Sequence, residues 1–395
     1  MQDRNVVLGV TGSIAAYKAV DLASKLTQDG VSVHTVMTES ATRLVGPASF
    51  RAITGHPVAT GMFELENPFS IEHVCLAELA DLVLIAPATA NFIAKTAAGL
   101  ADDLLTCTVL AARAPLLVAP AMHAAMWENP ATRANVDTLR ARGVRFIGPE
   151  SGRLASGTIG TGRLAPVERI LGEVLHVLGR DGDLAGRCIV ISAGGTRERI
   201  DPVRFVGNRS TGRMGFALAE AARDRGADVV LVSGPTGRPQ PSGVRIVEVE
   251  SASDMLEAVR TASADADALI MAAAVADYTP ASPSPKKLKK AEDALQLTLR
   301  RTADVLASVR NVPVRVGFAA ETAHVVENAR KKLEAKSLDF VVANDVGGDA
   351  APFGAETIEA TILSAAGEVE ALPRLSKRQL ADRILDRVRE LLEKR

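Results

Sequence analysis

Aromatic residues are scarce in this chain of 395 residues, at 3% of the composition. Proteins that bind single-stranded nucleic acid stack the bases on aromatic side chains, so we do not expect that function. An excess of one charge sign is lacking too, because 46 Lys and Arg oppose 47 Asp and Glu. With a formal net charge of −1, the chain has no general attraction for nucleic acid or for an anionic membrane.

Cysteines and long apolar runs are also few. Cys75, Cys107 and Cys188 are too few and too scattered for a disulfide framework or a zinc site. No apolar run approaches the roughly 18 residues that cross a bilayer. Residues 1–10 lack the basic and apolar segments of a signal peptide. We therefore expect a soluble cytoplasmic protein with no membrane partner.

What the chain does have is an alternation of short β-branched runs with amphipathic stretches. This alternation is typical of a parallel sheet covered by helices on both faces. A helix is predicted over residues 14–28, with Ile14, Tyr17, Leu22 and Leu26 on one face. The predicted strands of the first half are residues 6–10, 31–37, 81–86, 115–121 and 144–148.

The alternation stops at a Gly- and Asp-rich stretch, residues 178–187, and then restarts. We place a domain boundary there, between domains of residues 1–180 and 181–395. The predicted fold class is therefore α/β, with two doubly wound Rossmann-like domains whose sheets are mainly parallel. The predicted elements of the second half are strands at 188–193, 228–234, 244–250, 268–276, 314–320 and 338–345, a helix at 212–225, a hairpin turning at Ala366-Gly367, and a last helix with Ser376 as N-cap.

The first predicted strand runs through Gly9 and Gly12 into a helix. Glycine lets a phosphate approach the backbone closely, and a helix N-terminus supplies N–H donors. The spacing is not that of the G-x-G-x-x-G dinucleotide fingerprint. The second strand also ends in Thr38, where that fingerprint places a ribose-binding carboxylate. A mononucleotide is therefore favoured over NAD, and a purely structural turn stays open as the alternative.

Polar residues also follow two later strands, in "APATAN" (86–91) and "APAMHAAMWENP" (119–130). Ligands of open α/β sheets bind at the carboxyl ends of the strands, so we expect one shared crevice. Met126 and Trp127 in the second stretch indicate a pocket wall. His73 begins a helical stretch, although a lone histidine is more often an ordinary surface or capping residue.

Together, "GSIAAYK", "IEH", "APATANFIAKTAAGLADDLLT" and "PAMHAAMW" resemble the flavin-dependent cysteine decarboxylases, and among them the phosphopantothenoylcysteine decarboxylases. The resemblance implies that His73 is the catalytic base. It also implies that flavin oxidises the cysteine side chain of the substrate to a thioaldehyde, which accepts the electrons left when CO₂ departs. The residues implied in FMN binding are Gly12, Ser13, Thr38, Thr89 and Asn91.

Two stretches depart from that family's pattern. The family's P-x-M-N-x-x-M-W has an asparagine that holds the substrate carboxylate. Here His123 takes its place, ahead of Met126, and an imidazole can still donate a hydrogen bond. The family's A-C-G-D loop has a cysteine that protonates the enethiol product, and here Ser156 and Thr158 replace its cysteine and aspartate. Because a serine hydroxyl is a far poorer acid than a thiol, we expect the final reduction to be the weaker step.

Two basic stretches mark the second half. Residues 191–215 run from a strand to a helix through a long loop with five arginines, a composition suited to anionic ligands. "PSPKKLKK" (283–290) puts four lysines into five positions, and lysine supplies the mobile point charges that a triphosphate needs. A merely solvated basic surface is the alternative for both stretches.

These stretches, with "AAAVADY", "GFAAET" and "KKLEAKSLDFVVAND", closely resemble the bacterial, CTP-dependent phosphopantothenate–cysteine ligases. The resemblance implies that Asn208 acts on an acyl-cytidylate intermediate and that Lys287 is catalytic. Asp277 would hold Mg²⁺ and the nucleotide, because Mg²⁺ offsets the triphosphate charge. The remaining nucleotide and substrate contacts implied are Arg204, Phe318, Lys332 and Lys336.

The two resemblances together imply one fused enzyme of coenzyme A synthesis. Its ligase half would join cysteine to 4′-phosphopantothenate with CTP, and its decarboxylase half would make 4′-phosphopantetheine with FMN. They also imply a homo-oligomer, with a dimerising ligase half and a trimerising decarboxylase half. The alternatives are an NAD-linked oxidoreductase, or a ligase whose first half has decayed into a flavin-binding regulatory unit.

Overall fold

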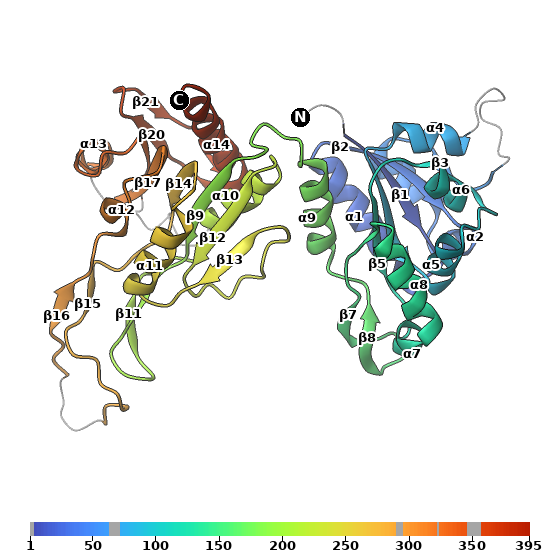
Figure 1. Ribbon diagram of the computed structural model, residues 1–395, viewed down its shortest axis with the longest axis horizontal. Helices are drawn as coiled ribbons and strands as arrows, with labels where there is room; N and C mark the ends of the chain where they lie inside the picture. The colour runs from blue at the N-terminus through green and yellow to red at the C-terminus, as the bar shows by residue number, and fades with distance from the viewer. Residues whose placement is uncertain (1–3, 63–71, 290–294, 322–323, 346–356) are drawn as a thin grey trace. The chain divides into compact units, whose positions relative to one another are not determined.

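The computed structural model describes residues 4–62, 72–289, 295–321, 324–345 and 357–395 (Figure 1). The chain divides into two compact units, Met1–Leu178 and Gly179–Arg395, and the division falls in the Gly- and Asp-rich stretch. In both units mainly parallel strands alternate with helices, so the predicted fold class is confirmed. No helix within these described ranges is long and apolar enough to cross a membrane.

The first unit is built on a six-stranded parallel sheet of order β3-β2-β1-β4-β5-β6. The order reverses between β1 and β4, and such a switch point is where ligands of doubly wound sheets bind. The strands are β1 (Arg4–Val10), β2 (Val31–Met37), β3 (Val58–Ala59), β4 (Leu82–Ala88), β5 (Leu116–Pro120) and β6 (Arg145–Phe146). A separate hairpin consists of β7 (Glu150–Arg153) and β8 (Ile159–Arg163).

Helices cover both faces of this sheet because successive strand residues point to opposite sides. Leu8 of β1 packs in one apolar cluster, and Val7 packs in another. Each fully buried side chain of this kind contributes about 1.5–3 kcal/mol. The first cluster includes residues of α1 (Tyr17–Gln28), α3 (Pro47–Thr54) and α9 (Val167–Leu178). The second includes residues of α5 (Ala90–Ala98), α6 (Leu104–Ala111) and α8 (Pro130–Ala141). The shorter elements are η1 (Ile14–Ala16), α2 (Glu39–Thr42), α4 (Glu72–Leu79) and α7 (Ala124–Glu128).

The helix predicted over residues 14–28 is only partly confirmed. It opens as the 3₁₀ turn η1, and Leu22 and Leu26 of α1 are buried as predicted. Ile14 and Tyr17, however, are 65% and 63% exposed, so their placement on the buried face was wrong. At about 100° per residue, Tyr17 lies roughly 140° around the helix from Leu22. Ile14 precedes the α-helix and does not follow its period.

The second unit has an eight-stranded sheet of order β13-β12-β9-β14-β17-β18-β20-β21. The strands are parallel as far as β18, and β20 and β21 are antiparallel. Its switch point lies between β9 and β14. The strands are β9 (Cys188–Ala193), β12 (Asp228–Ser233), β13 (Arg245–Glu248), β14 (Ala268–Met271), β17 (Val314–Glu321), β18 (Phe340–Asp345), β20 (Thr361–Ser364) and β21 (Val369–Ala371).

Helices again cover two faces, each with its own apolar cluster. One cluster includes residues of α10 (Arg213–Arg223) and α14 (Lys377–Glu393), and the other includes residues of α11 (Ala252–Ala262), α12 (Val305–Ser308) and α13 (Val325–Ala335). The predicted N-cap of the last helix is confirmed, since Ser376 Oγ accepts the Gln379 N–H at 3.1 Å. Three small sheets complete the unit: β10 (Arg197–Arg199) with β11 (Phe205–Gly207), β15 (Tyr278–Pro280) with β16 (Leu299–Arg301), and β19 (Thr357–Ile358) with β22 (Leu375–Ser376).

Two predictions about strands and loops in this unit were wrong. The strand predicted over residues 268–276 ends at Met271, because the backbone beyond it bonds to the loop after β9 instead of to a neighbouring strand. The long loop predicted between β9 and α10 contains the β10–β11 hairpin. The predicted hairpin at Ala366-Gly367 is confirmed, with Gly367 in the left-handed region at φ 90°.

Candidate active sites in the two units

The carboxyl ends of β1 and β4 are joined by one buried side chain, Thr11. Its hydroxyl donates to the Pro87 carbonyl at 2.8 Å and accepts the Thr89 N–H at 3.0 Å. The neighbouring strand β2 joins this edge through the Thr38 N–H, which donates to the Val10 carbonyl at 3.0 Å. Three strand ends are thus held together by hydrogen bonds at the switch point where the crevice is predicted. Sequence reasoning missed Thr11, although it stands between the two glycines of the first loop.

Three predicted FMN-binding hydroxyls open the helices that follow these strands. Ser13, Thr38 and Thr89 are the N-caps of η1, α2 and α5, and each accepts a backbone N–H at 3.3–3.4 Å. Gly12 lies where a Cβ atom would come within 2.4 Å of Ser40 Cβ. Only glycine therefore lets the first loop lie against the start of α2. The structure brings these four residues to one edge of the sheet.

The predicted base His73 does not belong to one of these three strand-end loops. It is half-buried on the first turn of α4, which contacts α6 and β1. Asn91 is exposed on the first turn of α5, directly after the Thr89 cap. Neither side chain is hydrogen-bonded to another predicted site residue in the described part of the chain, so their roles stay predictions.

His123 begins α7 as its N-cap. Its Nδ1 accepts the Ala125 N–H at 3.2 Å, so Nδ1 carries no proton in this arrangement and Nε2–H is the available donor. Met126 is 50% exposed beside it. Trp127, which was predicted to form part of a pocket wall, packs in the apolar core with its ring 5.3 Å from the Arg133 guanidinium.

The hairpin that carries Ser156 packs against the His123 segment. The Met122 N–H donates to the Gly162 carbonyl at 2.9 Å. A Cβ atom on Gly162 would come within 2.1 Å of the Met122 carbonyl oxygen, so glycine is needed for this approach. At the exposed tip, Ser156 Oγ and Thr158 Oγ1 are hydrogen-bonded at 2.8 Å. The positions that depart from the decarboxylase pattern therefore lie on two adjoining segments.

In the second unit, the loops after β9 and β14 are tied together. The Ala276 N–H donates to Thr196 Oγ1 at 2.9 Å, and the Ala274 N–H donates to the Gly194 carbonyl at 2.8 Å. Asn208 follows the β10–β11 hairpin, and its Nδ2 donates to the Ala274 carbonyl at 3.1 Å. Asn208 is thereby held on the short segment that leads to the exposed Asp277. The structure brings these two predicted residues to the same switch point.

The loop with the predicted catalytic lysine is held by a buried carboxylate, Asp201. Its Oδ2 accepts the Leu288 N–H at 3.2 Å, directly next to Lys287. Its Oδ1 accepts the backbone N–H groups of Val203 and Arg204, each at 2.8 Å. The Arg204 guanidinium in turn donates to the Leu288 carbonyl at 3.2 Å. Lys287 itself is exposed, and Lys290 of the same run lies outside the described residues.

Asp201 stays ionised in this setting. Burial favours the neutral carboxyl, but the backbone N–H donors of Val203, Leu288 and Arg204 outweigh it and hold the pKa of Asp201 below its usual range. Sequence reasoning missed this residue, since its partner Leu288 is distant in the chain. The only available signal was Asp-Pro inside a loop of unusual length.

Phe318 lies on β17, Lys332 lies on α13, and Lys336 is the C-cap of α13. Lys332 Nζ donates to the Phe318 carbonyl at 2.6 Å, and Lys336 pairs with Asp304 at 2.9 Å. Burial alone would raise the pKa of Asp304, but the bonds from Lys336 and the Ala307 N–H lower it. The expected phosphate contacts of both lysines stay predictions.

Two arginines of the long loop make contacts within the protein. Arg197 stacks on the Phe205 ring at 4.7 Å, and Arg199 is paired with Glu250. Acidic clusters that could hold a metal ion are not found where the chain is described. A Mg²⁺ ion bound through one carboxylate and nucleotide phosphates needs no such cluster.

Two doubly wound sheets, each with polar groups gathered at its switch point, define the class of α/β proteins that bind nucleotides or flavins there. The family model "Flavoprotein" matches residues 1–179, and that of the "DNA/pantothenate metabolism flavoprotein C-terminal domain" matches residues 184–392. The chain is 47% identical over 394 residues to the coenzyme A biosynthesis bifunctional protein CoaBC of Bacillus subtilis, with 98% of this chain and 97% of the relative covered. It is 46% identical over 409 residues to the CoaBC protein of Mycolicibacterium smegmatis, with 99% and 98% covered.

The chain belongs to the family of bifunctional coenzyme A biosynthesis proteins. The predicted enzyme, a phosphopantothenoylcysteine decarboxylase joined to a phosphopantothenate–cysteine ligase, is confirmed, and the NAD-linked alternative is wrong. Among solved structures, the C-terminal domain of a CoaBC protein is 41% identical with a TM-score of 0.47, covering 54% of this chain and 100% of that one.

Proposed function

We propose that the second unit joins cysteine to 4′-phosphopantothenate at the expense of CTP and that the first unit decarboxylates the product with FMN. The observation that carries this proposal is the position of the predicted residues. The hydroxyls and glycine for FMN gather at the β1/β4 switch point, and the ligase residues Asn208 and Asp277 gather at the β9/β14 switch point.

The first crevice fits a flavin mononucleotide. A phosphate needs close backbone approach and hydroxyl or N–H donors. Gly12, packed against Ser40, gives the approach, and the caps Ser13, Thr38 and Thr89 give the hydroxyls. When bound, the flavin supplies the two-electron oxidation of the substrate's cysteine side chain.

The residues of this chain then handle the proton and the carboxylate. His73, as base, takes a proton from the cysteine end of the substrate, and the Nε2–H of His123 donates to the carboxylate that leaves as CO₂. The Nδ1 bond to Ala125 supports this donor role, because it keeps the proton on Nε2. Ser156 would protonate the enethiol from the hairpin that packs against the His123 segment.

In the ligase half, the carboxylate of 4′-phosphopantothenate attacks the α-phosphorus of CTP, and pyrophosphate leaves. The cysteine amine then attacks the acyl carbon, and CMP leaves. Lys287 supplies positive charge where negative charge develops, from a loop held by Asp201 and Arg204. Asn208 holds the acyl-cytidylate. Asp277 would hold Mg²⁺, which would offset the phosphate charge of CTP before pyrophosphate leaves.

Phe318 packs at the cytosine, and Lys332 and Lys336 meet phosphates from α13. Lys332 donates to the Phe318 carbonyl of β17, and Lys336 pairs with Asp304, the N-cap of α12. We also propose a cytoplasmic homo-oligomer, in which the ligase half dimerises and the decarboxylase half trimerises.

The test is incubation of the full chain with 4′-phosphopantothenate, cysteine, CTP and Mg²⁺, followed by mass analysis. We expect a yellow protein, stoichiometric CMP, and 4′-phosphopantetheine together with some product two hydrogens lighter. Lys287→Ala should stop CMP release and keep the flavin, whereas His73→Asn should accumulate 4′-phosphopantothenoylcysteine. Accumulation of that intermediate by the unaltered protein would support a decayed first half, and equal rates with ATP would contradict the CTP assignment.

A further inference from the structure

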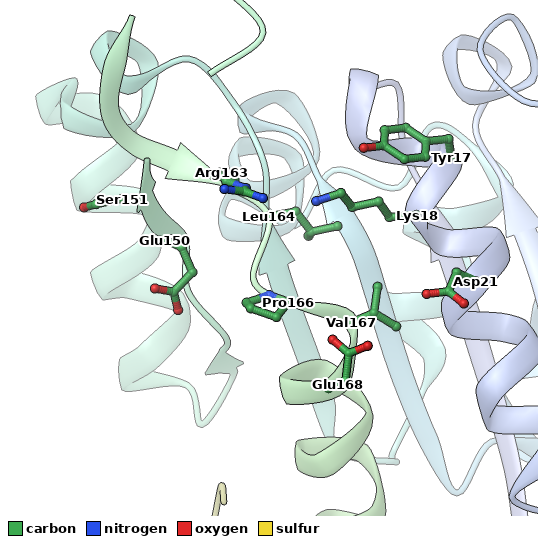
Figure 2. Close-up of a pocket in the computed structure, with 10 residues that line it drawn as sticks. All are labelled: Tyr17, Lys18, Asp21, Glu150, Ser151, Arg163, Leu164, Pro166, Val167 and Glu168. Atoms are coloured by element: carbon green, nitrogen blue, oxygen red, sulfur yellow. The ribbon is translucent and has the colours of Figure 1, made fainter. Parts of the chain in front are cut away.

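A concave pocket of about 560 Å³ lies in the first unit, apart from the predicted site residues. The first turns of α1 form one wall, and the base of the β7–β8 hairpin with the start of α9 forms the other (Figure 2). Its apolar floor includes Leu164 and Val167, which are buried. None of the functional residues proposed above lines this pocket.

Charge is distributed unevenly over the pocket wall. Its acidic side chains are already neutralised by lysine or arginine. Lys25 Nζ lies 3.1 Å from Asp21 and 2.8 Å from Glu168, and its hydrogen bond lowers the pKa of Glu168. Glu150 is likewise paired with Arg169. These carboxylates therefore already have cationic partners within the protein.

Two cations of the lining, Lys18 and Arg163, are not matched in this way. Figure 2 shows Lys18 extending from α1 toward the Arg163 side chain at the end of β8. Within the ranges that the structure describes, neither side chain has a hydrogen bond or an ion pair, and Lys18 acts on Glu168 only through space. Two like charges that face one another across a pocket are best satisfied by an anion that accepts from both.

The position of the pair suggests which anion it binds. Arg163 closes the strand that begins just after the Ser156 tip, and β8 spans Ile159–Arg163. At about 3.3 Å per residue this strand is about 13 Å long, and the turn adds a few ångströms. The decarboxylase substrate has about thirteen bonds between phosphorus and sulfur, which at the extended-chain rise give about 15 Å. A substrate whose sulfur is near Ser156 can thus reach Arg163 with its phosphate.

We propose that Lys18 and Arg163 bind the phosphomonoester of the decarboxylase substrate and so select phosphorylated over unphosphorylated pantothenoyl compounds. This inference rests on the proposed decarboxylation by the first unit. The flavin phosphate is the other phosphomonoester in that unit, and the test separates the two sources.

The test compares Lys18→Gln and Arg163→Gln with the unaltered full chain. Decarboxylation of 4′-phosphopantothenoylcysteine and of pantothenoylcysteine is measured, together with calorimetric binding of 4′-phosphopantetheine and pantetheine. We expect each variant to raise KM and Kd for the phosphorylated compounds about tenfold or more, since charge-assisted hydrogen bonds are lost. The unphosphorylated compounds and the flavin content should not change. Arg113→Gln, at an exposed cation before β5, is the matched control and should change nothing.

Three outcomes would overturn the inference: equal loss with both substrates, loss of flavin from the variants, or no preference for phosphorylated compounds in the unaltered chain. Failure of the proposed function looks different. In that case the unaltered chain would release no CO₂ from either substrate, and the binding comparison would still decide whether Lys18 and Arg163 recognise the phosphate.

Discussion

Asp201→Asn tests whether the hydrogen bond from Asp201 to the lysine loop positions Lys287, because the variant leaves Lys287 itself unchanged. In the native protein Oδ1 accepts the N–H groups of Val203 and Arg204, and Oδ2 accepts the N–H of Leu288 at 3.2 Å. Asparagine keeps one oxygen for the local turn. Its NH₂ group would then face the Leu288 N–H and the Arg204 guanidinium, and because all three groups are donors no hydrogen bond can form between them. The variant therefore breaks the long-range tether and preserves the turn.

The magnitude follows from what the tether positions. Leu288 is the direct neighbour of Lys287, so losing its hydrogen bond frees the segment that holds the Lys287 ammonium. A misplacement of about 1 Å can cost about 10²-fold in rate. We expect kcat of CMP release to fall by that order while KM for cysteine changes little, because the role proposed for Lys287 is to offset charge that develops in the transition state. Decarboxylation of supplied 4′-phosphopantothenoylcysteine should be unaffected.

The matched control is Asp267→Asn. Asp267 also accepts a backbone N–H, that of Cys188 at 2.8 Å, and pairs with Arg187 at 3.0 Å, but it lies at the amino ends of β9 and β14. If both variants lose ligase activity equally, the loss reflects general destabilisation. If Asp201→Asn ligates at nearly the normal rate with the same Tm, the tether does not position Lys287 and the reasoning is refuted.

Three further predictions concern the first unit. Gly162→Ala forces a methyl group toward the Met122 carbonyl, which destabilises the hairpin contact by about 1–3 kcal/mol. The variant should release CO₂ more slowly and keep its flavin and ligase activity. The control Gly46→Ala, where the added methyl group meets open space, should release CO₂ at the normal rate. Ser156→Cys should decrease a product two hydrogens lighter than 4′-phosphopantetheine, seen by mass analysis; absence of that species from the native reaction would show that Ser156 suffices. Burial and the neighbouring His56 lower the pKa of His34, so its contribution to stability is complete above the unfolded pKa of about 6.5 and is lost as pH falls from there. A Tm that drops on acidification equally in His34→Gln would contradict this.

Much of the fold could be predicted because its signals are local. The β-branched residues of Val31–Met37 predicted the strand β2, and Ser376 as N-cap predicted the start of the last helix. The rule that ligands bind at the carboxyl ends of parallel strands predicted one shared crevice in the first half, and the strand ends named for it do lie at one switch point. Hydroxyl residues directly after strands, such as Thr38 and Thr89, could be found in the same way because caps and phosphate contacts use the same residue types.

The rest depends on contacts between distant parts of the chain. The run after Met271 remains apolar, so periodicity extended β14 too far; the N–H of Ala273 instead donates to Ser192 Oγ at 3.0 Å. Asp201 carried no local sign that it would hold Leu288. Lys18 of α1 and Arg163 of β8 line the same pocket, and no sequence pattern within either element indicates that they do.

The same device fixes both switch points, and it can be tested in both units at once. Thr11 and Thr196 are each 1% exposed in the loop after a central strand, and each hydroxyl accepts an N–H from the loop across the switch point, Thr89 at 3.0 Å and Ala276 at 2.9 Å. Valine has the same shape without the hydroxyl, so it leaves a buried donor unsatisfied at about 1–3 kcal/mol. Thr11→Val should therefore weaken flavin retention and decarboxylation while ligation continues, and Thr196→Val should slow CMP release while flavin is kept. If either variant impairs both reactions, the two switch points are coupled and the units do not hold their sites independently.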